Sequence, residues 1–128
     1  MRFYFCTTSD KFGESMILYQ RIHDTIDPEN EDNKIKRICV SSSILGCLSA
    51  IGHTLSVRSK VNIYYCDVND MNKIYQPTIK NVSGVEYTGE FWLLEKQKFN
   101  FLKSIYINYR KHFYVKNSKL YSIKFEEL

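Results

Sequence analysis

The sequence lacks the signals by which many enzymes and membrane proteins are recognised. It contains no stretch of about 18 apolar residues, and its N-terminus turns polar after six residues, so we expect neither a membrane-spanning helix nor a secretory signal. The P-loop, G-x-G-x-x-G, H-E-x-x-H and G-x-S-x-G patterns are all absent. Their absence removes the strong motifs for phosphoryl transfer, Rossmann dinucleotide binding, zinc hydrolysis and serine hydrolysis. A cytoplasmic protein without membrane contact is the simplest expectation.

Metal-binding patterns are absent as well. The four cysteines, Cys6, Cys39, Cys47 and Cys66, lie in apolar contexts without C-x-x-C spacing, and the three histidines share no ligand spacing. We therefore expect buried free thiols in a reducing cytosol and no bound metal.

The residues that are present indicate a single α+β domain over residues 1–128. A hydrophobic content of 44% in 128 residues suits one sizeable core, and two domains would be cramped. Runs of β-branched and aromatic residues predict about six strands with one or two short helices.

Residues 53–60 are expected to be a polar connection, and Pro77 places the segment around it at a sheet edge, because proline lacks a ladder donor. Residues 89–99 fit a helix or a strand by periodicity, and their aromatic residues favour the strand. The other expected strands are residues 2–8, 34–40, 61–68, 102–110 and 119–128, and residues 15–22 fit a short strand or a helical turn.

Residues 37–52, with the sequence RICVSSSILGCLSAIG, form the most consistent local pattern in the chain. An apolar strand leads into three serines, and Ser42 or Ser43 can accept a hydrogen bond from an N–H group of the following turn. The pattern therefore predicts a serine-capped helix of about two turns that ends at Gly52. A structural cap explains the serines first, and a catalytic role is the alternative.

Charge is strongly segregated along the chain. Residues 23–33 contain five acids and no Lys or Arg, which predicts a solvated, mobile loop, either a surface loop or a lid. Residues 96–124 contain eight Lys or Arg residues and no acid, with aromatic residues between them. This segment is either a solvated basic face or a face that binds an acidic partner, such as a host or defence protein or a nucleic acid. The residues expected to contact such a partner are Lys98, Lys103, Tyr109, Arg110 and Lys111.

Three separated features form a further pattern. The first strand ends in Cys6-Thr7-Thr8, the second apolar strand ends in Ser41-Ser42-Ser43, and Glu90 follows Thr88-Gly89. In this order the chain resembles small phage and prophage proteins, whose layout is similar to the ADP-ribosyltransferase fold, including its RNA 2'-phosphotransferase branch. The resemblance covers about residues 2 to 110. It implies split sheets, mixed or antiparallel, that close on each other like a clam. Such sheets hold nicotinamide adenine dinucleotide (NAD) between the first strand, the three serines Ser41 to Ser43, called the serine corner below, and the carboxylate of Glu90.

The resemblance also implies roles for individual residues. A Ser or Tyr supports the nicotinamide ribose in such enzymes, and a Glu polarises its 2'-hydroxyl; these roles fall on Ser41 or Ser43 and on Glu90. Without catalysis, the serines are explained as the helix cap, and Glu90 as a strand-edge carboxylate paired with a lysine. The lone Trp92 is expected in the core.

One role in the resemblance has no clear residue. The family places a His or Arg on the first strand to orient the ribose, but this sequence has Phe5 or Cys6 there. Arg21 can substitute only if it folds into the cleft, and Thr7 is the other expected cofactor contact. Because a missing donor weakens positioning and charge stabilisation, this departure favours a lost or altered activity.

Three functions follow as hypotheses. The first is a phage- or prophage-derived binding or inhibitory protein, in the host cytoplasm, that needs no cofactor and uses an inactive ADP-ribosyltransferase-like scaffold and its basic aromatic face. The second is an NAD-dependent ADP-ribosyltransferase that modifies a macromolecule. The third is a nonspecific nucleic-acid-binding domain.

Overall fold

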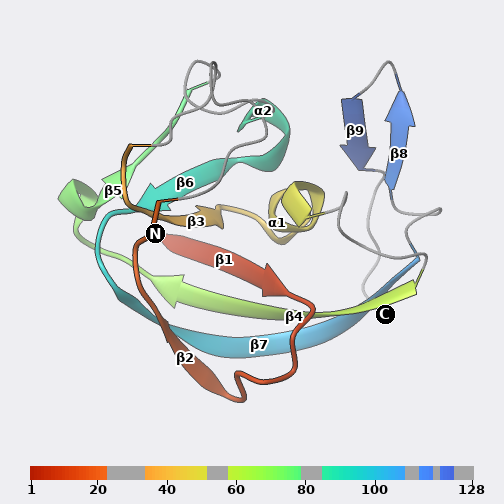
Figure 1. The fold of residues 1–128 in the computed structure, drawn as a ribbon, viewed down its shortest axis with the longest axis horizontal. Coiled ribbons are helices and arrows are strands. Elements are labelled where there is room, and N and C mark those ends of the chain that lie inside the picture. Colours follow the sequence, from red (N-terminus) through yellow and green to blue (C-terminus); the bar gives the residue numbers. More distant parts are fainter. Residues whose placement is uncertain (23–33, 52–57, 79–84, 109–112, 117–118, 123–128) are drawn as a thin grey trace.

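The computed structural model describes all residues except 23–33, 52–57, 79–84, 109–112, 117–118 and 123–128. Seven strands form one sheet in the order β2-β7-β4-β1-β3-β6-β5, and all of its adjacent pairs are antiparallel (Figure 1). The strands of this sheet are β1 (Arg2–Thr7), β2 (Ser15–Leu18), β3 (Ile38–Ser41), β4 (Arg58–Asp67), β5 (Ile74–Tyr75), β6 (Glu90–Leu93) and β7 (Gln97–Asn108). A separate hairpin consists of β8 (Phe113–Lys116) and β9 (Lys119–Ser122), and the helices are α1 (Ile44–Ile51), α2 (Val85–Thr88) and a 3-10 turn (Met71–Lys73).

The seven-stranded sheet consists of two halves that meet at one residue pair. In one half, β1 pairs with β4 along its whole length, and β4 pairs with β7. In the other half, β3 pairs with β6, and β6 pairs with β5. Between the halves, the register joins β1 to β3 only through Tyr4 and Ser41. The ladder between β1 and β3 is therefore limited to a single antiparallel pair.

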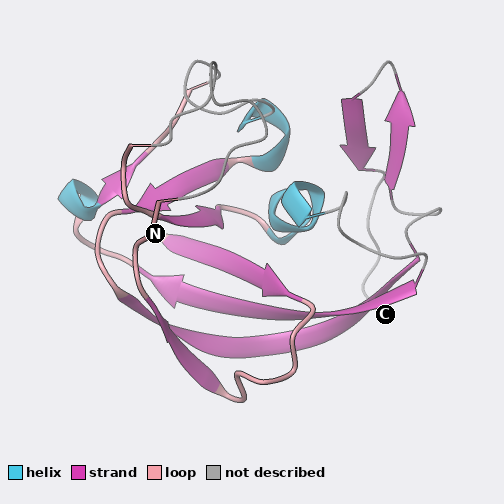
Figure 2. Ribbon diagram, viewed as in Figure 1, coloured by secondary structure: helices cyan, strands magenta, loops and turns pink. Residues whose placement is uncertain are grey.

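Two clusters of buried side chains form the core. One cluster contains Phe3, Tyr64 and Phe99 and extends across both halves of the sheet. The other lies beneath α1, where the fully buried Leu48 packs against the sheet that carries Ile63 and Ile105 (Figure 2). Full burial of a side chain such as Leu48 contributes about 2 kcal/mol. The helix is therefore held to the sheet by its apolar face rather than by helix propensity.

Several sequence predictions are confirmed. The structure is an α+β domain. Strand β1 lies within the expected segment 2–8, β4 overlaps the expected segment 61–68, and α1 follows the serines directly. Residues 15–18 form a strand, the weak segment near Pro77 contributes the edge strand β5, and Trp92 is fully buried. The alternation near residue 105 is also correct, since Ile105 and Ile107 are each 1% exposed whereas Tyr106 is 62% exposed.

Other predictions are corrected. The main strands form one antiparallel sheet rather than separate sheets of about six strands, because the pair of Tyr4 and Ser41 bridges the halves. Residues 58–60 belong to β4 and not to a connection. Residues 89–99 are two strands, because the chain turns after β6 and returns as the start of β7. The strand β8 was not expected from the sequence.

Some expectations fall outside the described residues. The acidic loop at 23–33, Gly52 at the expected helix end and residues 123–128 of the expected last strand are among them. Within the part of the chain that the structure describes, no helix is both long and apolar enough to cross a membrane.

Candidate functional site

A cavity of about 620 Å³ is lined by residues of both β1 and β3, next to the pair that joins them. Its walls come from the end of β1, the start of β3, α1 and the segment that links α2 to β6. This volume is within the range of small-molecule sites, which is about 300 to 1,000 Å³. Among the residues predicted from the sequence, the cavity brings together Ser41, Glu90 and Arg21.

The hydroxyl groups of Ser43 and Ser41 have different hydrogen-bond partners. Ser43 caps α1, because its Oγ accepts a hydrogen bond from the Gly46 N–H at 3.0 Å. Ser41 is 2% exposed, and its Oγ donates to the Thr88 carbonyl oxygen at 2.6 Å and accepts from the Ser43 N–H at 3.3 Å. Ser41 lines the cavity whereas Ser43 does not. The one hydroxyl proton of Ser41 is thus directed at the protein itself, and a ligand that took it would have to replace Thr88.

Glycines allow this corner to approach the α2 segment. A Cβ atom on Gly46 would overlap the Thr88 carbonyl oxygen and crowd Ser41 Oγ, so α1 can lie this close only with glycine at that position. Gly89 has a φ of +60° and ends α2 through a hydrogen bond from its N–H to the Val85 carbonyl at 3.0 Å. The result is a direct pairing of Ser41 with Glu90 in the β3–β6 ladder.

A buried charged assembly lies beside this pair. Glu90 Oε2 accepts a hydrogen bond from Trp92 Nε1 at 2.8 Å. The Arg37 guanidinium lies 4.0 Å from the centroid of the Trp92 ring and donates to the Ile35 carbonyl at 3.0 Å. Arg37 is only 3% exposed, yet it lines the cavity. The tryptophan therefore helps to orient the Glu90 carboxylate.

The Cys39 thiol lies within the same assembly. Burial raises its pKa to about 12, the Glu90 carboxylate adds to the increase, and a hydrogen bond with Arg37 opposes it. At neutral pH this cysteine is consequently protonated and a weak nucleophile. Among the described residues, no group of three or more His, Cys, Asp or Glu side chains is placed to hold a metal ion.

Sequence reasoning missed Arg37. It stands two residues before Cys39 and four before Ser41, and this alternation places all three on one face of the strand. That alternation was the available signal, but a charged residue at a strand start is usually solvated.

Arg21 reaches the cavity through pairing of the backbone. Its N–H donates to the Arg37 carbonyl at 3.0 Å, and the Arg37 N–H donates back at 2.9 Å. Lys11 is a third cation in the lining, with its ammonium 5.2 Å from the centroid of the Phe12 ring. Among the described lining residues, these three cations face one carboxylate, Glu90. The described part of the lining therefore carries a net positive charge.

The residues of β1 differ in whether they line the cavity. Phe5 and Cys6, at the position where the family pattern has a His or Arg, line the cavity with apolar and thiol surface. Thr7 is outside the lining, and its Oγ1 accepts from the Ser9 N–H at 3.1 Å to start the turn after β1. The side chain of Thr7 is thus used in a turn rather than in the cavity.

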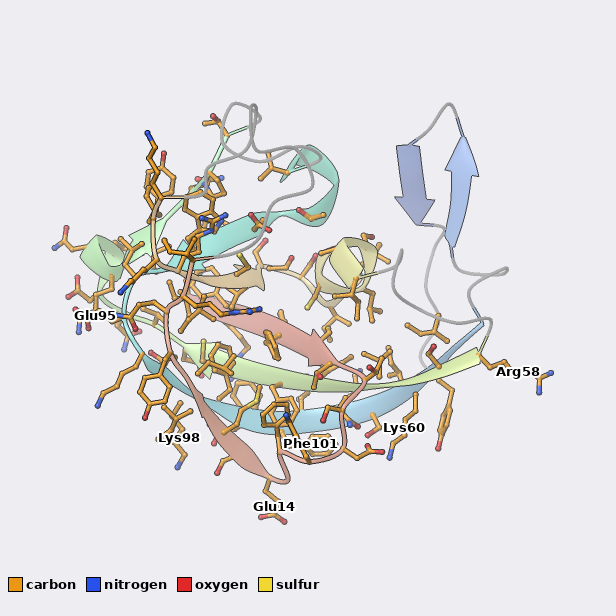
Figure 3. All side chains as sticks on the ribbon, in the orientation of Figure 1. Glu14, Arg58, Lys60, Glu95, Lys98 and Phe101 are labelled. Atoms are coloured by element: carbon orange, nitrogen blue, oxygen red, sulfur yellow. The ribbon has the colours of Figure 1, made fainter. Side chains whose placement is uncertain are left out.

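The basic face is described only in part. Lys98 is exposed and lies opposite Ile17 in the β2–β7 ladder, whereas Lys103 is half-buried opposite Ile63. Figure 3 shows Lys98 and Arg58 toward opposite ends of the sheet, and not in one cluster. Tyr109, Arg110 and Lys111 lie outside the described residues.

Taken together, the described lining contains both cationic and aromatic side chains. Guanidinium groups bind phosphates and carboxylates through paired hydrogen bonds, and aromatic rings stack on planar ligand rings. The aromatic residues of the lining are Phe5, Phe12 and Tyr19. In comparisons with known proteins, no family model, no curated protein and no solved structure matches the chain.

Proposed function

We propose that the protein binds an anionic, ring-containing small molecule of the nucleotide class, such as NAD, in the cavity between β1 and β3. The observation that carries the proposal is the composition of the lining, in which Lys11, Arg21 and Arg37 lie with three aromatic side chains around about 620 Å³. Cations alone are common on surfaces, and aromatic residues alone are common in cores. Their combination in a cavity of ligand size supports a site for phosphate and a planar base.

The two arginines are suited to the phosphate for different reasons. Arg37 is held against the Trp92 ring and the Ile35 carbonyl, so little of its rotamer freedom remains to be lost when a ligand binds. Arg21 is exposed and its side chain is freer, but its backbone is fixed to that of Arg37. One guanidinium is thus preorganised, and the other can close on the ligand from solvent.

The scaffold is proposed to be ADP-ribosyltransferase-like. Support comes from the single pair that joins the two halves of the sheet, from the cavity beside that pair, and from Ser41 opposite Glu90 at its edge. The resemblance implies that the dinucleotide lies between the first strand, the serine corner and the carboxylate, and residues of all three line this cavity.

Binding without turnover is the function that we favour on this scaffold. Ser41 donates its only proton to Thr88, and Glu90 accepts from Trp92, so both groups are engaged within the protein. Phe5 supplies no hydrogen bond at the place where a ribose-orienting donor is expected. A nucleotide-binding protein that retains the scaffold and lacks the activity agrees with all three features.

An NAD-dependent ADP-ribosyltransferase is the second candidate, and Arg21 is the observation that favours it. This arginine lines the same cavity as Ser41 and Glu90, which is the condition under which it substitutes for the missing donor. Transfer of label from NAD to a host lysate that disappears in Glu90→Gln would support this candidate.

Isothermal titration calorimetry with NAD, ADP-ribose and ATP tests the binding proposal. We expect binding by the wild type and a loss of about tenfold or more in affinity for Arg21→Gln, since a charge-assisted hydrogen bond contributes about 1.5 to 3 kcal/mol. Lys98→Gln is the matched control, because it removes one positive charge from an exposed side chain outside the cavity. Absence of binding to every nucleotide, or equal affinities for the two variants, would reject the proposal.

A further inference from the structure

Two cysteines from distant parts of the chain meet in the wall of the cavity. Cys6 lies on β1 and Cys47 on α1, and both belong to the buried cluster beneath the helix. Cys47 Sγ donates a hydrogen bond to the Tyr4 carbonyl oxygen of β1 at 3.6 Å, and burial followed by the nearby Cys47 thiol raises the pKa of Cys6. Both residues line the cavity although they are only 5% and 7% exposed. A small molecule that enters the cavity therefore lies against both cysteines.

We propose that Cys6 and Cys47 form an oxidation site, at which a small peroxide that enters the cavity converts the two thiols into an intramolecular disulfide. In the first step one thiol loses its proton and the thiolate attacks an oxygen of hydrogen peroxide; the O–O bond breaks, a sulfenic acid forms, and the departing hydroxide takes up that proton and leaves as water. In the second step the other thiol attacks the sulfenic sulfur, the S–S bond forms, and a second water leaves with the thiol proton. The pair loses two electrons, and the peroxide gains them.

The other two cysteines lack one of the features of this pair. Cys66 is 1% exposed and is not part of the lining, so an oxidant in the cavity does not reach it. Cys39 lines the cavity from β3, but its hydrogen-bonding neighbour is Arg37 and not a second thiol. Only the pair on β1 and α1, among the described residues, combines access with a resolving thiol.

The site reacts slowly and has structural consequences. Burial raises the pKa of Cys6, which keeps the thiolate scarce and makes oxidation a response to sustained exposure. The bond would fasten α1 to β1 and close a loop that contains β2, β3 and the serine corner. A disulfide over a loop of this length is expected to raise the melting temperature by on the order of 10 °C.

Non-reducing peptide mapping of the full chain after exposure to hydrogen peroxide tests the proposal. We expect loss of two hydrogen atoms in the intact mass, a linked peptide pair that contains Cys6 and Cys47, and reversal by dithiothreitol. The wild type alone supplies this result, so the test does not depend on a variant that folds. Cys39→Ser should keep the link, and Cys47→Ala should lose it. An unchanged mass, oxygen addition without a link, a link through Cys39 or Cys66, or dimers joined by disulfides would each overturn it.

Discussion

Replacement of Gly46 by alanine tests whether the close contact between α1 and the α2 segment builds the serine corner. In an open helix the change would stabilise the protein by about 0.5 to 1 kcal/mol, because glycine loses more backbone entropy on folding. Here the new methyl group would overlap the Thr88 carbonyl oxygen and lie close to Ser41 Oγ and Ser43 Oγ. The carbonyl belongs to the backbone, so relief requires a shift of the helix or of the α2 segment.

The expected change in the free energy of unfolding combines two destabilising contributions with one stabilising contribution. Overpacking of a tight contact costs about 1 to 3 kcal/mol, and a shift that separates Ser41 from Thr88 removes a hydrogen bond of about 1 kcal/mol. After subtraction of the gain in helix propensity of about 0.5 to 1 kcal/mol, we expect a net loss of about 1 to 3.5 kcal/mol. Gly46→Ala should therefore lower the urea midpoint clearly, with an unchanged slope.

The control is Gly13→Ala, since a Cβ at that position meets no atom within 4 Å and only its φ of +67° opposes the substitution. That strain is about 1 kcal/mol. If Gly46→Ala is as stable as the wild type, or loses less stability than Gly13→Ala, the contact does not have the role that we assign to it.

Three further predictions concern the cap, an ion pair and the basic face. Ser43→Ala should reduce the free energy of unfolding by about 1 kcal/mol through loss of the helix cap, and Ser43→Asp, which restores an acceptor, should recover most of it in urea titrations. Hydrogen bonds from Arg2 lower the pKa of the Asp67 carboxyl in the folded protein. The small contribution of this ion pair to stability is therefore complete above the unfolded pKa of about 3.9, and it disappears as the pH falls through the lower folded pKa. Asp67→Asn should remove this component from the pH profile of unfolding. Reversal of charge at Lys98 and Lys103 together with Arg110 and Lys111 should weaken capture of an acidic partner or an oligonucleotide and flatten the salt dependence of binding, and equal binding by wild type and variant would exclude the basic-face hypothesis.

Local pattern was sufficient to predict the elements whose structure depends on their own residues. The run around Ile105 alternates apolar and exposed positions, and the serines before α1 supply the cap that the sequence suggested. It was insufficient for β4, whose first residues, Arg58 to Lys60, look like a polar connection. Those residues are in a strand because β7 is long enough to pair with them, and that is a property of another segment.

The candidate site was predictable in its residues but not in its charge. The resemblance suggested Ser41 or Ser43 together with Glu90, and Ser41 is paired with Glu90 through the β3–β6 ladder. The position of Arg37 depends on the Trp92 ring, more than 50 residues later, which covers a guanidinium that the sequence alone would leave in water. The position of Arg21 depends on the backbone bridge to Arg37. Contacts of this kind are set by tertiary structure, and the hydrophobic periodicity of the sequence does not predict them.

The burial of Arg37 is also the feature that distinguishes a binding site from a chance gap between strands. A guanidinium that is 3% exposed has lost nearly all its hydration, and its Nε is buried without a hydrogen-bond partner among the described residues, which costs free energy. Replacement of such a group by a hydrophobic residue of similar size is often neutral or stabilising when the group has no other use. Arg37→Met should therefore leave the protein folded and at least as stable by urea denaturation while its affinity for NAD falls about tenfold or more. A variant that loses stability and keeps its affinity would show that Arg37 serves the fold, and the cavity would then have no preorganised anion contact.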